Sequence, residues 1–376
     1  MPKTKVAMYG LSSEGYRIAR EIADKAQVTI VDEMLQMALD MELPFLKKNP
    51  DLQEVMEEEN LMGFKPLVRI LGEADVIFFT PKLRRPSDET LIESGSKLRD
   101  LSKHLSRSVT LVNTLPTGPG GNSENIMIVE KQTGLKLGST LTYSYMPLRP
   151  RESRPTVVAT AGGQDNDLLG PLGYQRTSQN VFAAELEYVS EVMKAAVASV
   201  VGIEMARRAR ETRVLLKEEP SVFIDEFASS LYELKAVQAS EETGESISYL
   251  AGAAVKSFEN YVRYIVDETR DVLKEKQLKA SRTKIGLLWT LDKYEMRGER
   301  LHVAESVQQR LKDYVTDVDV FPGAKLKEGP GTFDPLKHNV VIVCSKEDQD
   351  ALIQFRKSQR SVELTQISAT PGLRRE

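Results

Sequence analysis

The chain has 376 residues, which is long for one hydrophobic core and predicts two or three domains. Hydrophobic residues make up 41% of it and charged residues 28%, an ordinary globular composition. The formal net charge of −4 provides no general attraction to nucleic acid or to an anionic membrane, so we expect neither as a partner.

The numbers and positions of the cysteines and histidines exclude disulfides and argue against metal sites. The single cysteine, Cys344, excludes an intrachain disulfide and a cysteine-based metal cluster. The three histidines lie far apart without ligand spacing, so we expect no metal site. No stretch approaches about 18 consecutive apolar residues, and the N-terminus has no leader pattern. We therefore expect a cytoplasmic protein.

The first predicted elements are a strand, a glycine turn from Gly10 to Gly15, a helix, and a strand that ends at Asp32. This order suits a dinucleotide: helix N–H groups face the pyrophosphate, and the acid binds the ribose hydroxyls. Asp32 and Glu33 would repel a 2′-phosphate, which favours NAD over NADP. Ser12 stands at the middle glycine of G-x-G-x-x-G, where its side chain would crowd the phosphate.

Further strands continue this first α/β domain. Residues 74–79 form a short apolar run that ends at Thr80-Pro81, and 108–113 form a second run that ends at Thr114. A loop rich in glycine and proline follows, up to Gly121. Ligands of doubly wound sheets lie at the carboxyl ends of the strands, so these residues are expected to border the site. Strands at 141–144 and 156–163 close the domain.

The middle of the chain is predicted to be helical. Residues 182–216 form a long helix with an apolar stripe, consistent with either a buried core helix or a dimer core. The stripe consists of Leu186, Val189, Met193, Ala196, Val200 and Ile203. A second long helix is expected over 249–273.

A polar break at 274–283 precedes a second α/β unit, with strands at 284–289, 317–321 and 339–344 and a helix at 303–311. The predicted domains are therefore 1–175, 176–280 and 283–365, followed by a flexible tail at 366–376.

This order of domains resembles the UDP-glucose/GDP-mannose dehydrogenase family over nearly the whole chain. Thr80-Pro81 and Thr114-Leu-Pro-Thr-Gly118 match family motifs, and the segment 130–138 matches a third. The resemblance implies an N-terminal Rossmann-like NAD-binding domain, a central helical domain and a C-terminal Rossmann-like domain. It also implies NAD as cofactor, a nucleotide-sugar as ligand and a homodimer through 182–216. The cofactor would be bound by Gly10, Ser12, Gly15, Asp32, Thr80, Pro81 and Thr114.

A lysine and an arginine that address the nucleotide-sugar in the family correspond to Lys293 and Arg300, which keep the family's spacing. Asp292 replaces the aromatic residue before the lysine, and Leu301 replaces an acid. The alternative interpretation is that both cations are solvated loop charges.

The residues that carry the family's chemistry are replaced. The resemblance places Ala253 at the cysteine nucleophile and Ser257 at an acid, while Lys256 is kept. In the long helix, Glu187 and Glu191 replace the lysine and asparagine that stabilise an oxyanion. We expect these two carboxylates to be solvated or ion-paired surface groups. Cys344 ends an apolar strand, which favours an inert core thiol.

One catalytic candidate remains, because Glu152 falls on the family's general acid/base glutamate. The neighbouring Arg149, Arg151 and Arg154 could pair with Glu152 or bind phosphate; an exposed basic loop is the alternative.

Three hypotheses follow. The first is a divergent, non-catalytic or altered family member that keeps the frame and binds NAD or a nucleotide. The second is an NAD-dependent dehydrogenase limited to one two-electron oxidation, with Glu152 as base. The third is a structural or regulatory dimer that ignores nucleotides.

Overall fold

The structure is a computed structural model. It describes residues 3–32, 67–84, 89–105, 108–151, 154–163, 168–212, 214, 222–328, 333–334, 336–358 and 364–367. The chain divides into two compact units. The first comprises 1–191, 236–245 and 294–298, and the second comprises 192–235, 246–293 and 299–376. Over the described ranges, no helix combines the length and the apolar character that a membrane span requires.

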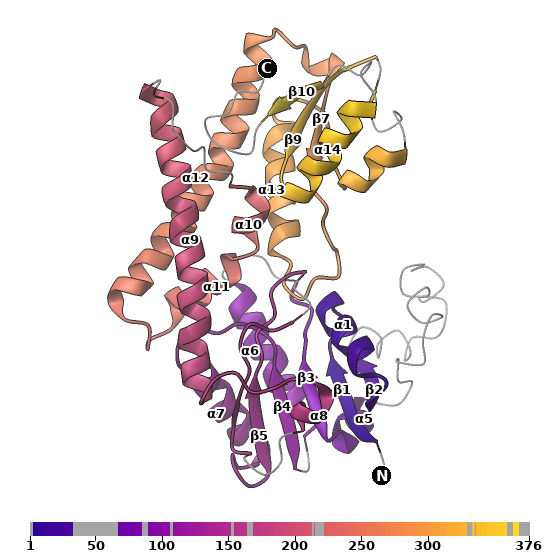
Figure 1. Ribbon diagram of the computed structural model, residues 1–376, viewed down its shortest axis with the longest axis vertical. Coiled ribbons are helices and arrows are strands. Elements are labelled where there is room, and N and C mark those ends of the chain that lie inside the picture. The colour runs from indigo at the N-terminus through magenta and orange to yellow at the C-terminus, as the bar shows by residue number, and fades with distance from the viewer. Residues whose placement is uncertain are drawn as a thin grey trace. The chain divides into compact units, whose positions relative to one another are not determined.

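The first unit is built on a six-stranded sheet in the order β2-β1-β3-β4-β5-β6 (Figure 1). All pairings are parallel except that of β5 with β6. The strands are β1 (Thr4–Tyr9), β2 (Ala26–Val31), β3 (Val76–Phe79), β4 (Val109–Asn113), β5 (Leu141–Tyr145) and β6 (Ala159–Ala161). The strand expected at 156–163 is therefore shorter, and it runs against its neighbour.

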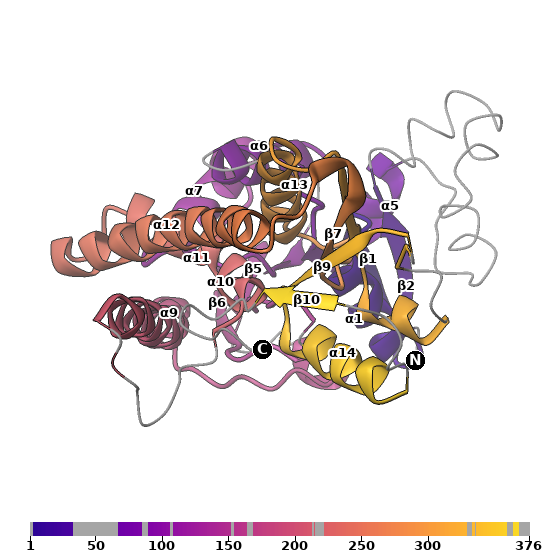
Figure 2. The ribbon, with the colours of Figure 1, turned by 90° about the horizontal axis from the view of Figure 1, so that it is seen from above.

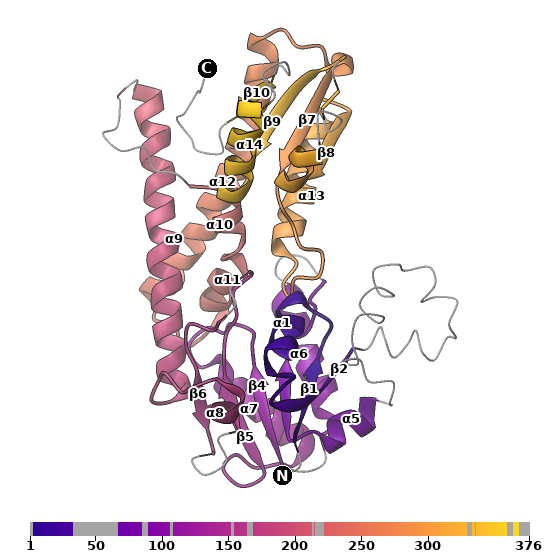
Figure 3. The same cartoon turned by 45° about the vertical axis from the view of Figure 1, so that its right-hand side comes forward.

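Helices alternate with these strands (Figure 3). They are α1 (Ser13–Ile22), α5 (Leu67–Glu73), α6 (Glu89–Ser102), α7 (Gly121–Thr133) and α8 (Leu169–Leu172). Strands β3, β4 and β5 are buried along their whole length, as expected for central parallel strands covered on both faces.

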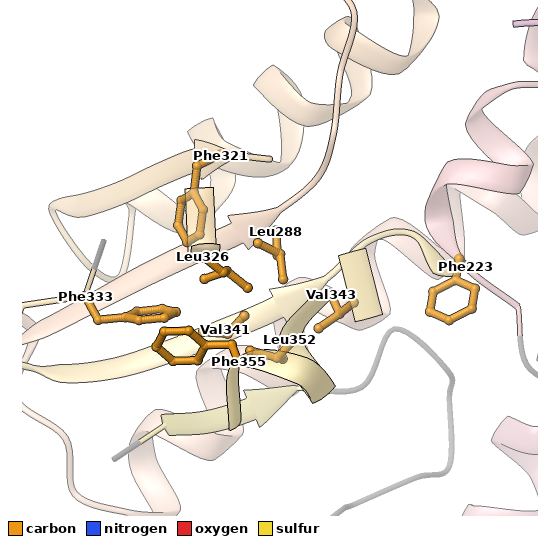
Figure 4. Packing of buried hydrophobic residues seen from close by; sticks show 9 residues of the cluster. All are labelled: Phe223, Leu288, Phe321, Leu326, Phe333, Val341, Val343, Leu352 and Phe355. Carbon is orange, nitrogen blue, oxygen red and sulfur yellow. The ribbon is translucent and has the colours of Figure 1, made fainter. Parts of the chain in front are cut away.

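The second unit contains a four-stranded parallel sheet in the order β10-β9-β7-β8. Its strands are β7 (Thr283–Leu288), β8 (Asp317–Phe321), β9 (His338–Val343) and β10 (Leu364–Ile367), accompanied by α13 (Glu299–Lys312), α14 (Lys346–Ser358) and the 3₁₀ segments η1 (Ala280–Arg282) and η2 (Gly323–Glu328). Aromatic and aliphatic side chains from the strands and α14 form a core (Figure 4). Strand β10 includes the first two residues of the expected tail; 368–376 lie outside the described residues.

The helical part consists of α9 (Val181–Thr212), α10 (Ile224–Ala228), α11 (Leu231–Ala239) and α12 (Glu245–Glu275). Viewed from above, α9 is seen nearly end-on while α12 lies across the view (Figure 2). Val189, Ala196 and Ile203 of the expected stripe are buried, but Leu186 is 46% exposed. A separate helical domain at 176–280 stays a prediction. The expected fold class is confirmed: two Rossmann-like parallel sheets at the two ends of the sequence, and long helices between them in the chain.

Candidate functional site

The glycine turn meets the end of β3 at the carboxyl edge of the first sheet. Gly10 has a φ of +112°, and a Cβ there would lie 2.3 Å from the carbonyl oxygen of Thr80 and 2.6 Å from Cα of Pro81. A Cβ on Gly15 would lie 2.6 Å from Thr80 Oγ1. Both glycines are therefore required by close packing against the Thr80-Pro81 segment, whether or not a ligand is present.

Ser12 caps α1 through its side chain. Its hydroxyl accepts a hydrogen bond from the Gly15 N–H (3.1 Å) and donates one to the Thr80 carbonyl (3.0 Å). This is the ordinary role of a serine at an N-cap. The sequence pattern does not indicate this hydrogen-bond partner of Ser12, because Thr80 follows the neighbouring strand β3.

Asp32 follows β2 and contributes to the same turn. One of its carboxylate oxygens accepts the Leu11 N–H at 2.9 Å. The ribose role expected for Asp32 stays a prediction, and Glu33 lies outside the described residues.

A distant segment, Tyr294–Gly298, belongs to the first unit and crosses this edge beside the start of α1 (Figure 3). The Ser13 N–H donates to the Tyr294 carbonyl at 2.8 Å. The Met296 N–H donates to the Glu14 carboxylate at 2.8 Å, and the Met296 carbonyl accepts the Leu83 N–H at 2.7 Å. We call Tyr294–Gly298 the crossing segment. No sequence motif indicated Glu14 or Met296 as members of the site.

The crossing segment is buried against its partners. Met296 is 1% exposed and Glu14 is 3% exposed. Burial raises the pKa of the Glu14 carboxyl above its usual value, and the Met296 N–H and the cations of Arg297 and Arg17 partly oppose that shift. Lys82 places its ammonium over the Tyr294 ring, 4.7 Å from the centroid.

Thr114 joins the same edge from the end of β4. Its hydroxyl donates to the Phe79 carbonyl at 2.6 Å and lies 3.3 Å from Met296 Sδ. The structure thus brings together Gly10, Ser12, Gly15, Asp32, Thr80, Pro81 and Thr114, all expected from sequence, at one edge of the sheet.

A second buried carboxylate accepts hydrogen bonds from the loop that follows Thr114. Glu185 of α9 is 1% exposed and accepts the N–H groups of Gly120 (2.8 Å) and Asn122 (2.7 Å) at the start of α7. The Asn122 side-chain amide and the Thr117 hydroxyl also donate to it. Burial raises the pKa of the Glu185 carboxyl, and these donors oppose the shift. Glu185 is therefore the acceptor, from within the protein, for the N–H groups at the positive end of α7.

Five N–H groups of the turn and of the start of α1 have acceptors within the protein. A pyrophosphate binds the free N–H groups of the turn and of the first helical residues. Here those of Gly10, Leu11, Ser13, Gly15 and Tyr16 donate to acceptors within the protein. The buried Glu14 carboxyl lies in the first turn of α1, where the charges of Arg297 and Arg17 act on it.

The cations expected at the substrate have different environments in the second unit. Arg300 is 1% exposed and is bonded to the carboxylate of Asp225 and the Thr290 carbonyl. The interpretation of Arg300 as a solvated loop charge is therefore wrong, because Asp225 compensates its charge inside the protein. Lys293 is exposed. Lys256 is exposed and pairs with Glu259 on α12, 2.9 Å away.

Asp348 lies at the carboxyl edge of the second sheet and binds the turns that follow three of its strands. It is fully buried and accepts hydrogen bonds from Thr290 after β7, Gly323 after β8 and Ser345 after β9. Ser345 in turn accepts the Asp348 N–H at 3.1 Å, a reciprocal cap of α14. Asp348 thus links the turns that follow β7, β8 and β9.

At the described positions where the resemblance expects the nucleophile and the two oxyanion donors, the chain has other groups. Ala253 is exposed on α12. Glu187 accepts from Ser178, and Glu191 pairs with Arg149 at 3.7 Å, which confirms both as surface or paired carboxylates. Cys344 is buried, and burial raises the pKa of its thiol well above the usual value. Glu152 lies outside the described residues.

Comparisons with known proteins identify the fold. No protein-family model matches the chain, and no curated protein matches it in sequence. Among solved structures, a UDP-D-ManNAc dehydrogenase from Pyrococcus horikoshii superposes with a TM-score of 0.62 at 15% identity, covering 98% of this chain and 99% of that one. A UDP-N-acetyl-mannosamine dehydrogenase from Staphylococcus aureus gives 0.60 at 13%, covering 98% of each. A UDP-glucose dehydrogenase from Pyrobaculum islandicum gives 0.59 at 12%, covering 98% and 94%. The chain therefore shares the fold of these UDP-sugar dehydrogenases.

Proposed function

We propose that this protein is a catalytically inactive member of the UDP-glucose/GDP-mannose dehydrogenase family, and that it acts through binding rather than through oxidation. The fold supports the family, and the sequence motifs at Thr80-Pro81 and Thr114–Gly118 agree with it. The single observation that carries the inactivity is the state of the only cysteine. The Cys344 thiol is buried at the end of β9, where burial disfavours the thiolate that a covalent step requires.

The oxyanion positions support the same conclusion. Glu191 occupies one of them and is ion-paired with Arg149, whose guanidinium lies 5.2 Å from the Tyr188 ring centroid. A carboxylate beside a developing oxyanion would raise the energy of the transition state instead of lowering it.

Absorbance at 340 nm tests this proposal. We expect no NADH from purified protein with NAD and UDP-glucose, UDP-N-acetylmannosamine or GDP-mannose. We also expect none from Ala253→Cys, because one thiol does not restore the oxyanion donors. Formation of two NADH per uronate by the unchanged protein would contradict the proposal. NADH formed by the wild type but lost in Glu152→Gln would instead establish the two-electron dehydrogenase.

We further propose that the protein is a homodimer through α9, the helix that the sequence predicts over 182–216. Exposed apolar side chains recur on α9 at Val197, Val201 and Met205, which are 37%, 53% and 54% exposed. Their spacing of four places them on one face, as an isologous helix contact requires. Light scattering coupled to gel filtration should give twice the chain mass, and Val201→Glu with Met205→Glu should give a folded monomer. A wild-type monomer would exclude this dimer.

A further inference from the structure

The crossing segment Tyr294–Gly298 places a hydrogen-bond acceptor at the start of α1, where a pyrophosphate normally accepts hydrogen bonds. In a nucleotide-binding domain of this topology, the first helix presents N–H donors to an anion at the carboxyl edge of the sheet. Here the Tyr294 carbonyl accepts the Ser13 N–H at 2.8 Å, so a peptide oxygen occupies that position.

Three hydrogen bonds of its backbone fix the segment to this edge, two to backbone groups and one to the Glu14 carboxylate. Ser13 begins α1, Glu14 lies in its first turn, and Leu83 follows the Thr80-Pro81 segment. Met296 contributes two of these bonds and is 1% exposed. Gly298 follows it; a Cβ there would lie 3.4 Å from the Leu83 carbonyl, so the backbone passes close to this loop. Surface loops seldom have such buried backbone partners at both a donor and an acceptor.

Glu14 holds the crossing segment at this edge. Its carboxyl group accepts the Met296 N–H at 2.8 Å and is itself buried. Loss of this acceptor should therefore loosen the segment whose Tyr294 carbonyl takes the Ser13 N–H.

We propose that Tyr294–Gly298 is an intramolecular occupant of the dinucleotide edge, held by Glu14, and that NAD binds only after this segment has been displaced. The apparent affinity for NAD is then reduced by the fraction of molecules in which the edge is open. This inference concerns binding and is independent of the catalytic proposal, since a protein that makes no NADH can either bind NAD or exclude it.

Isothermal titration with NAD tests the proposal on four full-length proteins: wild type, Glu14→Gln, Glu14→Ala and Met296→Gly. The glutamine keeps an acceptor for the Met296 N–H and removes the charge, so it is the matched control. Glu14→Ala removes both the acceptor and the charge. Met296→Gly removes the Sδ contact with Thr114 and loosens the segment without altering Glu14. Circular dichroism establishes which variants are folded, and Met296→Gly covers the case in which Glu14→Ala is not.

We expect no saturable binding by the wild type at millimolar NAD. Folded Glu14→Ala or Met296→Gly should bind NAD at least about tenfold more tightly than Glu14→Gln. Three results would overturn the proposal: micromolar binding by the wild type, equal binding by Glu14→Gln and Glu14→Ala, or no binding by the folded loosened variants. The first is a binding result and leaves the absence of oxidation untouched; NADH formation would contradict only the catalytic proposal.

Discussion

The guanidinium of Arg300 is held by the carboxylate of Asp225, with Arg300 Nε 2.7 Å from Asp225 Oδ1 and a second contact through Nη2. Arg300 is 1% exposed, and the indole Nε1 of Trp289 donates to the same oxygen. A residue that resembles a substrate-binding cation is thus part of the interior of the second unit.

Removal of one member of this pair should be strongly destabilising. Asp225→Ala leaves the Arg300 charge buried without its main counter-ion, and we expect a loss of about 3–5 kcal/mol in the free energy of unfolding. Urea denaturation measures it. Lys256→Ala removes an exposed pair with Glu259 and is the control, with an expected change within about 1 kcal/mol. Equal effects of the two substitutions would contradict the structural role of Arg300.

Ser12 should contribute stability as a helix cap. Ser12→Ala removes both the Gly15 N–H acceptor and the donor to Thr80, and we expect a loss of about 1–2 kcal/mol. Ser12→Gly, which restores the glycine pattern, should cost less at the cap itself. Thermal unfolding of the two variants ranks them; a neutral Ser12→Ala would show that the cap contributes nothing.

Gly10 and Gly134, two of the glycines with positive φ, should differ in their tolerance of alanine. Gly10→Ala places a Cβ 2.3 Å from the Thr80 carbonyl in addition to its φ of +112°, so we expect the variant not to accumulate as folded protein. Gly134 ends α7 with a φ of +76° and nothing within 4 Å of its Cβ. Gly134→Ala should therefore cost only about 1–2 kcal/mol. Soluble yield and melting temperature compare the two, and similar values would contradict the close approach at Gly10.

The raised pKa of the Glu14 carboxyl predicts a pH dependence. An acid whose pKa is higher in the folded state binds more protons there, so stability falls as pH rises from the unfolded pKa, near 4.5, to the folded pKa. Glu14→Gln does not titrate and lacks this decline. The urea midpoint of Glu14→Gln relative to wild type should therefore increase as the pH rises above about 4.5 towards the folded-state pKa. A difference that is constant with pH would contradict the burial of Glu14.

The sequence predicts the elements of the fold well, because the buried parallel strands are short apolar runs that end in turn residues. The runs ending at Thr80 and Thr114 mark the carboxyl edge directly. Strand β6 is less predictable, since its three residues pair antiparallel with β5, and that pairing leaves no periodic pattern.

The crossing segment could not be predicted in the same way. Met296 and Glu14 are separated by 282 positions, and the bond between them uses a backbone N–H that carries no sequence signal. The burial of Arg300 could not be predicted for a related reason: its partner Asp225 is 75 positions away in another helix. A local sequence pattern can identify a polar or charged side chain, whereas the partner of that side chain depends on tertiary structure.

Amide hydrogen exchange at Ser13 in the wild-type protein, with and without NAD, tests the central claim most directly. The account predicts that the Ser13 and Met296 amides are protected as strongly as the interior of α1, and that millimolar NAD leaves their rates unchanged. Rapid exchange at both amides without ligand, or protection that appears only with NAD, would contradict it.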